Sequence, residues 1–243
     1  MGTKFSTRIW VGVVGIASIF WGSKGYADTV VSVADFGLKP DTRENAVAYV
    51  QKAIEACRGK EPVTLVFPEG RYDFWPQYAH EKNYYETNTY DVFPKRLAML
   101  FEGFHNITVD GNGSQFVMHD RIQPITVENC DGVTLKNFSI DWDIPLTAQA
   151  RVIKVGSDFF EIEINVLESP YIIEDGKLVF VGEGWKSALG SMIEFESDTH
   201  FVVPGTGDLV LGRNWRDYTA VSPRYGIVRL SRKGGFERYP AEG

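Results

Sequence analysis

The sequence has few of the residues that build metal centres and disulfide frameworks. Its 243 residues include two cysteines, Cys57 and Cys130, and four histidines. The histidines are scattered and lack the short spacings of a zinc site, so we expect neither a bound metal nor a cofactor. The cysteines could pair in an oxidising compartment, but each lies in an apolar pattern where a small buried hydrophobe is common. The sequence therefore leaves the pairing open.

Basic residues are also in the minority. Lys and Arg number 25 against 32 Asp and Glu, which gives a net charge of −7. An acidic protein has little electrostatic attraction to nucleic acid or to anionic lipid, so nucleic acid is not an expected partner. A strongly anionic polysaccharide is disfavoured for the same reason, unless a basic patch or a bound cation intervenes.

Long apolar runs are absent after the first 21 residues. Lys4 and Arg8 precede a mostly apolar run at 9–21, and small residues follow at 25–27. This pattern predicts a signal peptide at 1–27, because the run is shorter than the roughly 20 residues of a spanning helix. An uncleaved N-terminal anchor is the alternative. We expect an exported protein, periplasmic or extracellular, with no membrane attachment after cleavage. Without the three basic residues of that segment the net charge is −10.

The sequence does contain a repeat. Residues 106–111 (NITVDG) and, 26 residues further on, 132–137 (GVTLKN) each carry a short apolar/polar alternation that runs into a turn. One such strand per repeat is typical of a solenoid, in which each coil buries its apolar edge against the next. We therefore expect a parallel β-helix. The residues expected to stack are Ile107 over Val133 and Val109 over Leu135.

The segment before the repeat is predicted to form a cap. A strand at 30–33 is followed by a helix whose apolar positions run from Ala46 to Cys57, with Asp41 or Thr42 as its N-cap. A further strand is expected at 63–67. A lone strand and a helix would cover the open end of the solenoid, which otherwise exposes core and unpaired edge.

Regular patterning lapses from Trp75 to Arg96, where aromatic residues alternate with Asn, His and Glu. Loops of this length are usually functional or disordered, and the aromatic content argues against disorder. We interpret the segment as a flap that packs its own aromatic side chains on the solenoid, with a ligand platform as the alternative.

After Pro145 the pattern changes to short strands at close spacing. In 160–164 (FEIEI) the apolar residues share one face and two Glu the other, which is typical of an antiparallel sheet with one wet side. The predicted fold is mostly β: a right-handed parallel β-helix with an N-terminal cap helix and an inserted small antiparallel β-barrel. The expected divisions are a signal peptide at 1–27, the first part of the β-helix at 28–145, an inserted barrel-like module at 146–231 and a return segment at 232–243.

About three coils with no cap at the far end would leave a core face open to water. We therefore expect the sequence to be a piece of a longer protein.

The sharpest candidate site is Asp141-Trp142-Asp143. On a strand, the two Asp share one face about 6.5 to 7 Å apart, with Trp142 opposite. That separation is near the lower limit for the acid and base of an inverting glycosidase. In a solenoid such carboxylates more naturally come from neighbouring coils, so we favour both Asp binding sugar hydroxyls or capping a turn, with Trp142 at the junction. The predicted substrate-binding residues are Asp141, Trp142, Asp143 and Trp75.

Three further motifs carry less information. Residues 110–113 (DGNG) lack the further acids of a calcium loop and are interpreted as a turn in which Gly supplies positive φ. Residues 182–185 (GEGW) are placed in the inserted module without a role. The third motif, 213–218 (RNWRDY), suits sugar recognition or a stabilising Arg over Trp stack equally well.

These residues carry a resemblance at two levels. Residues 33–37 (VADFG) with Asp41, and 65–72 (LVFPEGRY), resemble the entry to the pectate-lyase-like superfamily of right-handed β-helices. More closely, 106–114 (NITVDGNGS), then 133–143 (VTLKNFSIDWD), then a β-rich module resemble the N-terminal part of glycoside hydrolase family 110. Members of that family are exported bacterial α-1,3-galactosidases.

The resemblance implies removal of terminal α-1,3-linked galactose from glycans, with inversion and without a metal. The partner would be a galactose-terminated oligosaccharide or glycan, and the oligomeric state is left open. The catalytic carboxylates of that family lie in coils after the insertion, so catalytic residues are expected beyond Gly243. No catalytic residue is assigned here, and this piece alone is expected to be inactive. The alternatives are a β-helical polysaccharide lyase and a non-catalytic glycan-binding solenoid.

Overall fold

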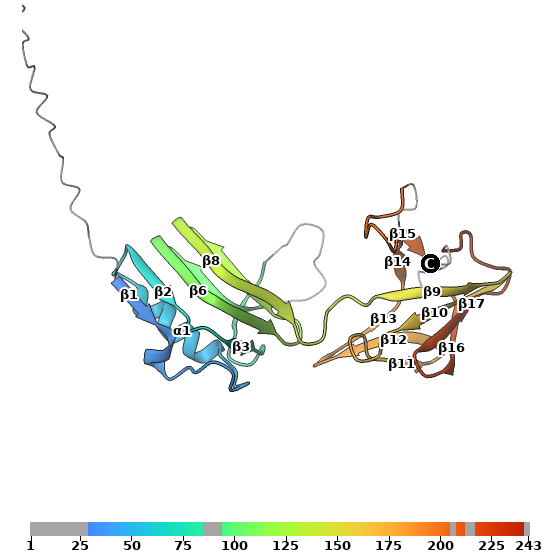
Figure 1. The fold of residues 1–243 in the computed structure, drawn as a ribbon, viewed down its shortest axis with the longest axis horizontal. Helices are drawn as coiled ribbons and strands as arrows, with labels where there is room; N and C mark the ends of the chain where they lie inside the picture. Colours follow the sequence, from blue (N-terminus) through green and yellow to red (C-terminus); the bar gives the residue numbers. More distant parts are fainter. Residues whose placement is uncertain (1–28, 85–93, 205–207, 212–216, 241–243) are drawn as a thin grey trace, which may run out of the picture.

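The computed structural model describes residues 29–84, 94–204, 208–211 and 217–240. Parallel strands and one α-helix form the N-terminal half of the described chain, and antiparallel strands form the C-terminal half (Figure 1). No helix among these residues is long and apolar enough to cross a membrane. The predicted signal peptide at 1–27 lies outside the described residues.

Five parallel strands form the first sheet, in which the long strand β6 is shared. The first half of β6 pairs with β2 and the second half with β3, while β8 pairs with both halves. The register joins Ile107 to Val133 and Val109 to Leu135, as the repeat predicts. The strands are β1 (Thr29–Ser32), β2 (Val63–Val66), β3 (Arg71–Phe74), β6 (His105–Met118) and β8 (Asp131–Trp142).

The prediction that both members of each stacked pair are buried is only partly correct. Val109 is fully buried, but Leu135 is 41% exposed and Ile140 on the same strand 39%. The reason is that β8 pairs with β6 on one side and with no described strand on the other. Leu135 and Ile140 therefore lie on an open face of the edge strand. Other apolar side chains of the same strand pack partly on the first core, namely Val133, Phe138 and Trp142.

A second sheet contains two parallel strands and one short antiparallel strand. β5 pairs in parallel with β7, and β4 runs antiparallel to β5. The prediction that regular structure lapses from Trp75 to Arg96 is wrong in part, because β4 forms within that segment. The flap's aromatic residues at 85–93 lie outside the described residues. The strands are β4 (His80–Lys82), β5 (Lys95–Glu102) and β7 (Gln123–Glu128).

The cap helix is present but begins later than predicted. A short 3-10 helix, η1 (Val33–Phe36), precedes α1 (Val47–Cys57), whose buried side chains face the first core. Asp41 and Thr42 do not cap α1. Asp41 has φ 62° and its carboxylate accepts the backbone N–H of Arg71 at 2.9 Å, so it is held by β3. The Val47 amide donates to Asn45 Oδ1 at 3.1 Å. Both cysteines are free thiols.

The 110–113 segment is a bend within β6, where the pairing to β8 shifts register between Asp110 and Ser114. Positive φ occurs at Asn112 (50°) and Gly113 (85°), but not at Gly111. Gly111 serves a different purpose: a Cβ there would lie 2.5 Å from Phe138 Cβ and 2.7 Å from the Asn137 carbonyl oxygen. The prediction that Gly supplies positive φ is therefore right for Gly113 and wrong for Gly111.

The C-terminal half consists of antiparallel strands around a second core. Phe160, Ile162 and Ile164 are buried, as the alternation predicts, while the intervening Glu161 and Glu163 pair with arginines. Four strands form its largest sheet. These are β16 (Thr219–Arg224), β17 (Ile227–Ser231), β10 (Phe159–Ile164) and β9 (Ala150–Val155).

Smaller sheets complete this half. Phe236 and Tyr239, within the predicted return segment, also pack on the second core. Of the 213–218 motif, residues 213–216 lie outside the described residues and Tyr218 is buried in that core. The remaining strands are β11 (Tyr171–Glu174), β12 (Lys177–Gly182), β13 (Trp185–Ala188), β14 (Ser191–Ile193) and β15 (Asp208–Val210).

Candidate functional site

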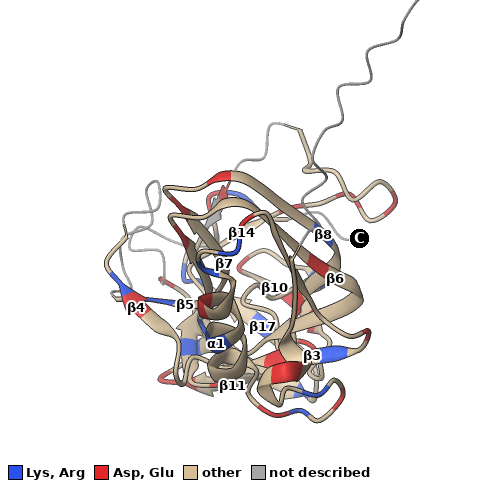
Figure 2. Cartoon of the chain, turned by 90° about the vertical axis from the view of Figure 1, so that its left-hand side faces the viewer, with Lys and Arg blue, Asp and Glu red and all other residues tan. Residues whose placement is uncertain are grey.

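Charged and aromatic side chains gather where β3 and the ends of β6 and β8 meet the turn between β12 and β13. The parallel register explains the meeting, because β3, β6 and β8 run side by side and end at the same level. Figure 2 shows that both signs of charge lie close together around β3. We call this the Asp73 cluster; its members are Arg71, Asp73, Trp75, His119, Asp143 and Glu183.

Asp73 is the buried centre of the cluster. Its side chain is fully buried, and Arg71 donates to it from Nε at 3.0 Å and from Nη2 at 2.6 Å. Burial by itself raises the pKa of Asp73, but hydrogen bonds from Arg71 and His119 outweigh it and hold the pKa below its usual value. Asp73 is therefore an anion near neutral pH, and the same contact raises the pKa of Arg71.

His119 links two carboxylates from different halves of the chain. The ring is only 2% exposed, with Nε2 2.8 Å from Asp73 Oδ1 and Nδ1 2.6 Å from Glu183 Oε2. It also stacks on the indole of Trp75, with ring centroids 3.8 Å apart and planes 10° from parallel. Both nitrogens can donate at once only when the ring carries two protons. The ring is thus fixed from three directions.

Asp143 and Glu183 are the two carboxylates of the cluster that reach solvent, with side chains 35% and 36% exposed. Asp143 Oδ1 accepts from Arg71 Nη2 at 2.6 Å and lies 3.6 Å from Arg43 Nη1. A carboxylate held in place by a guanidinium and open to water is well suited to accept hydrogen bonds from sugar hydroxyls.

The structure brings two of the four predicted site residues, Asp143 and Trp75, into this cluster. The Trp142 ring packs on the first core, and its Nε1 donates to the Asp120 carbonyl at 3.1 Å. Asp141 is exposed and accepts the backbone N–H of Trp142 at 2.8 Å, without a contact to the cluster. The two aspartates therefore have different surroundings.

Sequence reasoning missed Arg71, Asp73, His119 and Glu183. One signal was available: Arg71 and Asp73 alternate on a strand and so share a face. Glu183 lies in the 182–185 motif, which the sequence analysis placed in the inserted module without assigning it a role. His119 follows β6 directly, and only the register of the strands places it beside Asp73, 46 residues away in sequence.

Asp73, His119 and Asp143 each present a ligand atom, and these atoms lie within 4.8 Å of one another. Sequence spacing could not reveal such a group. However, Arg71 Nη2 donates to both Asp73 and Asp143 at 2.6 Å, so a guanidinium already occupies the position between the carboxylates. Its charge would repel a second cation, and the donor set fits an internal ion-pair network better than a metal site.

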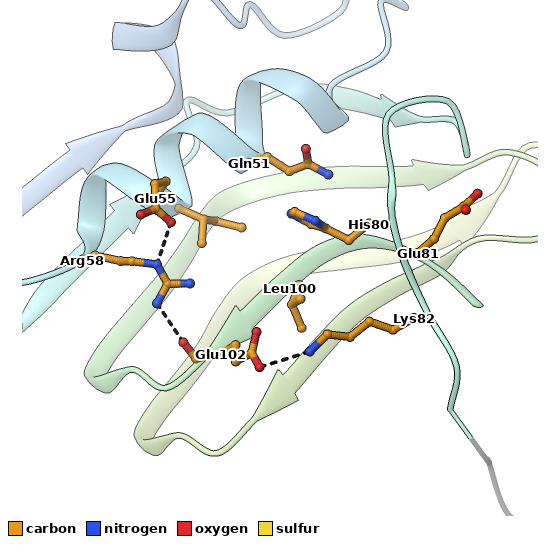
Figure 3. Close-up of a pocket in the computed structure, with 9 residues that line it drawn as sticks. Gln51, Glu55, Arg58, His80, Glu81, Lys82, Leu100 and Glu102 are labelled. Carbon is orange, nitrogen blue, oxygen red and sulfur yellow. Dashed lines mark hydrogen bonds and ion pairs between the residues drawn. The ribbon is translucent and has the colours of Figure 1, made fainter. Parts of the chain in front are cut away.

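A separate hollow of about 220 Å³ lies between α1 and the β4–β5 pair (Figure 3). Its charges are largely engaged with one another, since Arg58 pairs with Glu55 at 2.6 Å and Lys82 with Glu102 at 3.1 Å. No predicted site residue lines it. The Asp73 cluster, which combines predicted residues with a buried charged network, is therefore the stronger candidate site.

Comparison with known proteins gives matches to both halves. The family described as GLAA-B beta-barrel domain I matches residues 148–243. Alpha-1,3-galactosidase B of Bacteroides thetaiotaomicron is 55% identical over 219 residues, covering 89% of this chain and 35% of that protein.

Other curated relatives carry similar names. Alpha-1,3-galactosidase A of Shewanella woodyi is 37% identical over 169 residues, covering 69% of this chain and 28% of that protein. Alpha-1,3-galactosidase B of Phocaeicola vulgatus is 36% identical over 205 residues, covering 83% and 32%. The chain spans about a third of the length of these relatives. The resemblance seen in the sequence is confirmed: the chain is a homologue of proteins named α-1,3-galactosidase.

Proposed function

From this homology we propose that the chain is part of an exported glycoside hydrolase that removes terminal α-1,3-linked galactose from glycans, with inversion and without a metal. The observation that carries the proposal is the 55% identity over 219 aligned residues, which cover 89% of this chain, because a match of that length must include both the parallel sheets and the antiparallel module. Shared fold alone would be weak support for an activity. Close similarity across two unlike modules is stronger.

The parallel half is proposed to be the beginning of a right-handed β-helix. In its support, strands follow the same order twice: β2, β3 and β5, then the two halves of β6 and β7, each pairing in parallel with its counterpart. β8 begins a third round at the 26-residue interval. Right-handedness follows from the strong preference of parallel crossover connections.

The proposed reaction is a single displacement. One carboxylic acid protonates the glycosidic oxygen while a carboxylate on the opposite face activates water. We assign neither role to a described residue. The contribution of this chain is to bind galactose: Asp143 accepts hydroxyl hydrogen bonds, and the half-buried Trp75 offers apolar surface to the sugar ring. Asp141, exposed nearby in sequence, is a further hydroxyl acceptor, and Trp142 supports the junction.

Hydrolysis by the full-length gene product tests the proposal. Incubated with galactosyl-α-1,3-galactose, it should release free galactose, and it should leave the α-1,4-linked isomer intact. Binding of galactose termini without release would favour the glycan-binding solenoid. Calcium-dependent cleavage of a uronate polymer, with formation of an unsaturated product, would favour the lyase.

Export is proposed from residues 1–27. Their basic start, apolar run and small residues at the end are the features a signal peptidase requires. N-terminal sequencing of the protein recovered from the periplasm or the medium should begin at Asp28. A product that retains Met1 in the membrane fraction would favour the uncleaved anchor.

A further inference from the structure

The contacts of the Asp73 cluster form one continuous chain that crosses from the antiparallel module to the candidate sugar-binding surface. Glu183 Oε2 lies 2.6 Å from His119 Nδ1, and His119 Nε2 lies 2.8 Å from Asp73 Oδ1. The same Asp73 oxygen accepts from Arg71 Nη2 at 2.6 Å, and Arg71 Nη2 also donates to Asp143 at 2.6 Å. No link in this chain is longer than 2.8 Å.

We propose that Glu183 is a positioning residue, which fixes the orientation of Asp143 through His119, Asp73 and Arg71. The inference rests on the proposed role of Asp143 in binding galactose. It gives the antiparallel module a part in the site without any contact between Glu183 and the sugar.

The turn that carries Glu183 is built to reach the cluster. Gly182 pairs with Trp185, so Glu183 and Gly184 form a two-residue turn between β12 and β13. Gly184 has φ +76°, and a Cβ there would lie 2.3 Å from Asp120 Oδ2. The positive φ favours glycine at this position, and any added Cβ would require the Asp120 side chain to move. In Figure 1 this end of the antiparallel half lies toward the ends of β6 and β8.

A second contact holds the same turn against the loop after β6. The guanidinium of Arg121 lies 6.0 Å from the centroid of the Trp185 ring. The side-chain carboxylate of Asp120 faces Gly184, and the backbone carbonyl of the same residue accepts the indole N–H of Trp142. The turn is therefore set on a loop that is itself anchored at the end of β8, next to Asp143.

The two residues in the middle of this series of contacts are buried. Their burial couples Glu183 at one end to Asp143 at the other. Asp73 and His119 are 1% and 2% exposed, so their mutual contact is shielded from water, while the Glu183 side chain at one end is 36% exposed. The carboxylates of Glu183, Asp73 and Asp143 alternate with the basic side chains of His119 and Arg71, and Arg43 lies beside Asp143 at the end. Removing one carboxylate unbalances this set, and a buried donor without a partner is costly.

Loss of Glu183 should therefore release the His119 ring and change how Arg71 divides its hydrogen bonds between Asp73 and Asp143. Removing a group that holds a sugar-binding carboxylate weakens ground-state and transition-state binding alike, which raises KM and leaves kcat nearly unchanged.

The test compares Glu183→Ala, Glu183→Gln and a control, Glu174→Ala, in the full-length protein. Glu174 is a carboxylate of the same three-stranded sheet, half exposed and paired with Lys186 at 2.8 Å. We expect Glu183→Ala to raise KM for galactosyl-α-1,3-galactose about tenfold, with kcat within about twofold. Glu183→Gln, which keeps an acceptor oxygen, should recover most of the loss, and the control should match the wild type.

A double-mutant cycle separates positioning from general weakening. If Glu183 acts through Asp143, Glu183→Ala should add no further increase in KM to Asp143→Asn. Additive increases would overturn the proposal, as would an unchanged KM in Glu183→Ala.

Tryptophan fluorescence gives a readout that does not require hydrolysis. Because the His119 ring stacks on Trp75, its release in Glu183→Ala should change the emission, and the change should vanish in a Trp75→Phe background. If the wild type releases no galactose, the proposed function fails, and the emission alone decides whether Glu183 fixes His119. No change in emission would overturn the link itself.

Discussion

Asp143 and Trp142 are neighbours in sequence but belong to different surroundings. Asp143 faces solvent beside Arg71, while Trp142 packs on the first core and donates to the Asp120 carbonyl. In the full-length protein, Asp143→Asn should raise KM about tenfold with little effect on stability. Trp142→Phe should lower the free energy of unfolding by about 1 to 2 kcal/mol and leave kcat close to that of the wild type.

Steady-state kinetics and denaturant unfolding of both variants test this division. Unchanged kinetics for Asp143→Asn would remove Asp143 from the site. Loss of activity in a fully stable Trp142→Phe would place the indole at the sugar instead of at the junction.

Asp73 predicts how stability depends on pH. Since its folded pKa lies below the unfolded value of about 3.9, its ion pairs stabilise the fold fully above that value. That stabilisation is lost as the pH falls through the lower, folded pKa. Asp73→Asn should be less stable than the wild type at pH 7 and should lose less of its remaining stability between about pH 5 and pH 2.

Thermal unfolding across that pH range measures the difference. The matched control is Asp131→Asn, an exposed aspartate at the start of β8, which should follow the wild type. Parallel losses in Asp73→Asn and the wild type would show that Asp73 does not carry the acid sensitivity.

The two thiols should differ in reactivity. Cys57 is fully buried in α1, and burial raises the pKa of its thiol to about 11. The thiolate is the reactive form, so Cys57 should resist iodoacetamide at pH 8 in the folded protein, while the half-buried Cys130 is alkylated first. Peptide mass spectrometry before and after unfolding reads this out. Faster labelling of Cys57 than of Cys130 would contradict the packing of α1.

At the scale of elements, the bend in β6 depends on one close approach. An added Cβ at Gly111 would meet Phe138 and the Asn137 carbonyl at well under 3 Å. Gly111→Ala should therefore destabilise the fold by roughly 1 to 3 kcal/mol. The control is Gly103→Asn, because Gly103 has φ +71° with nothing within 4 Å of its added Cβ, and Asn tolerates that conformation.

Denaturant unfolding of the two variants provides the measurement. A Gly111→Ala protein as stable as the control would mean that β6 and β8 separate readily at the bend, and that their pairing there is not tight.

Local patterns predicted the elements better than their ends. The 26-residue interval gives the register of β6 and β8 correctly, because apolar residues at matching positions align neighbouring strands. The start of α1 was wrong since Asp41, a good N-cap by type, is held by the Arg71 backbone, a contact across 30 residues. The exposure of Leu135 could not be predicted from the sequence either, because it depends on which strand lies beyond β8.

The candidate site was predicted only where its residues carry a local signal. Asp143 and Trp75 attract attention by their type and position. His119 and Asp73 become a pair through strand register, and Glu183 joins them through the docking of a distant turn. Contacts between residues 46 and 64 positions apart cannot be predicted from the periodicity or composition of the sequence.

For the whole molecule, the Asp73 cluster is compatible with the proposed hydrolysis without a metal. Arg71 already occupies the position between Asp73 and Asp143. Treatment of the full-length protein with EDTA should leave galactose release unchanged. Activity that is lost on chelation and restored by calcium would contradict this and revive the lyase alternative.

The central claim is that the protein hydrolyses terminal α-1,3-linked galactose with inversion. Proton NMR during digestion of the methyl β-glycoside of galactosyl-α-1,3-galactose by the full-length protein tests it most directly, because all free galactose then comes from the cleaved terminus. The account predicts that the β-anomer of galactose appears first and then mutarotates to the equilibrium mixture of the α- and β-anomers. Initial release of the α-anomer, or no release of galactose, would contradict it.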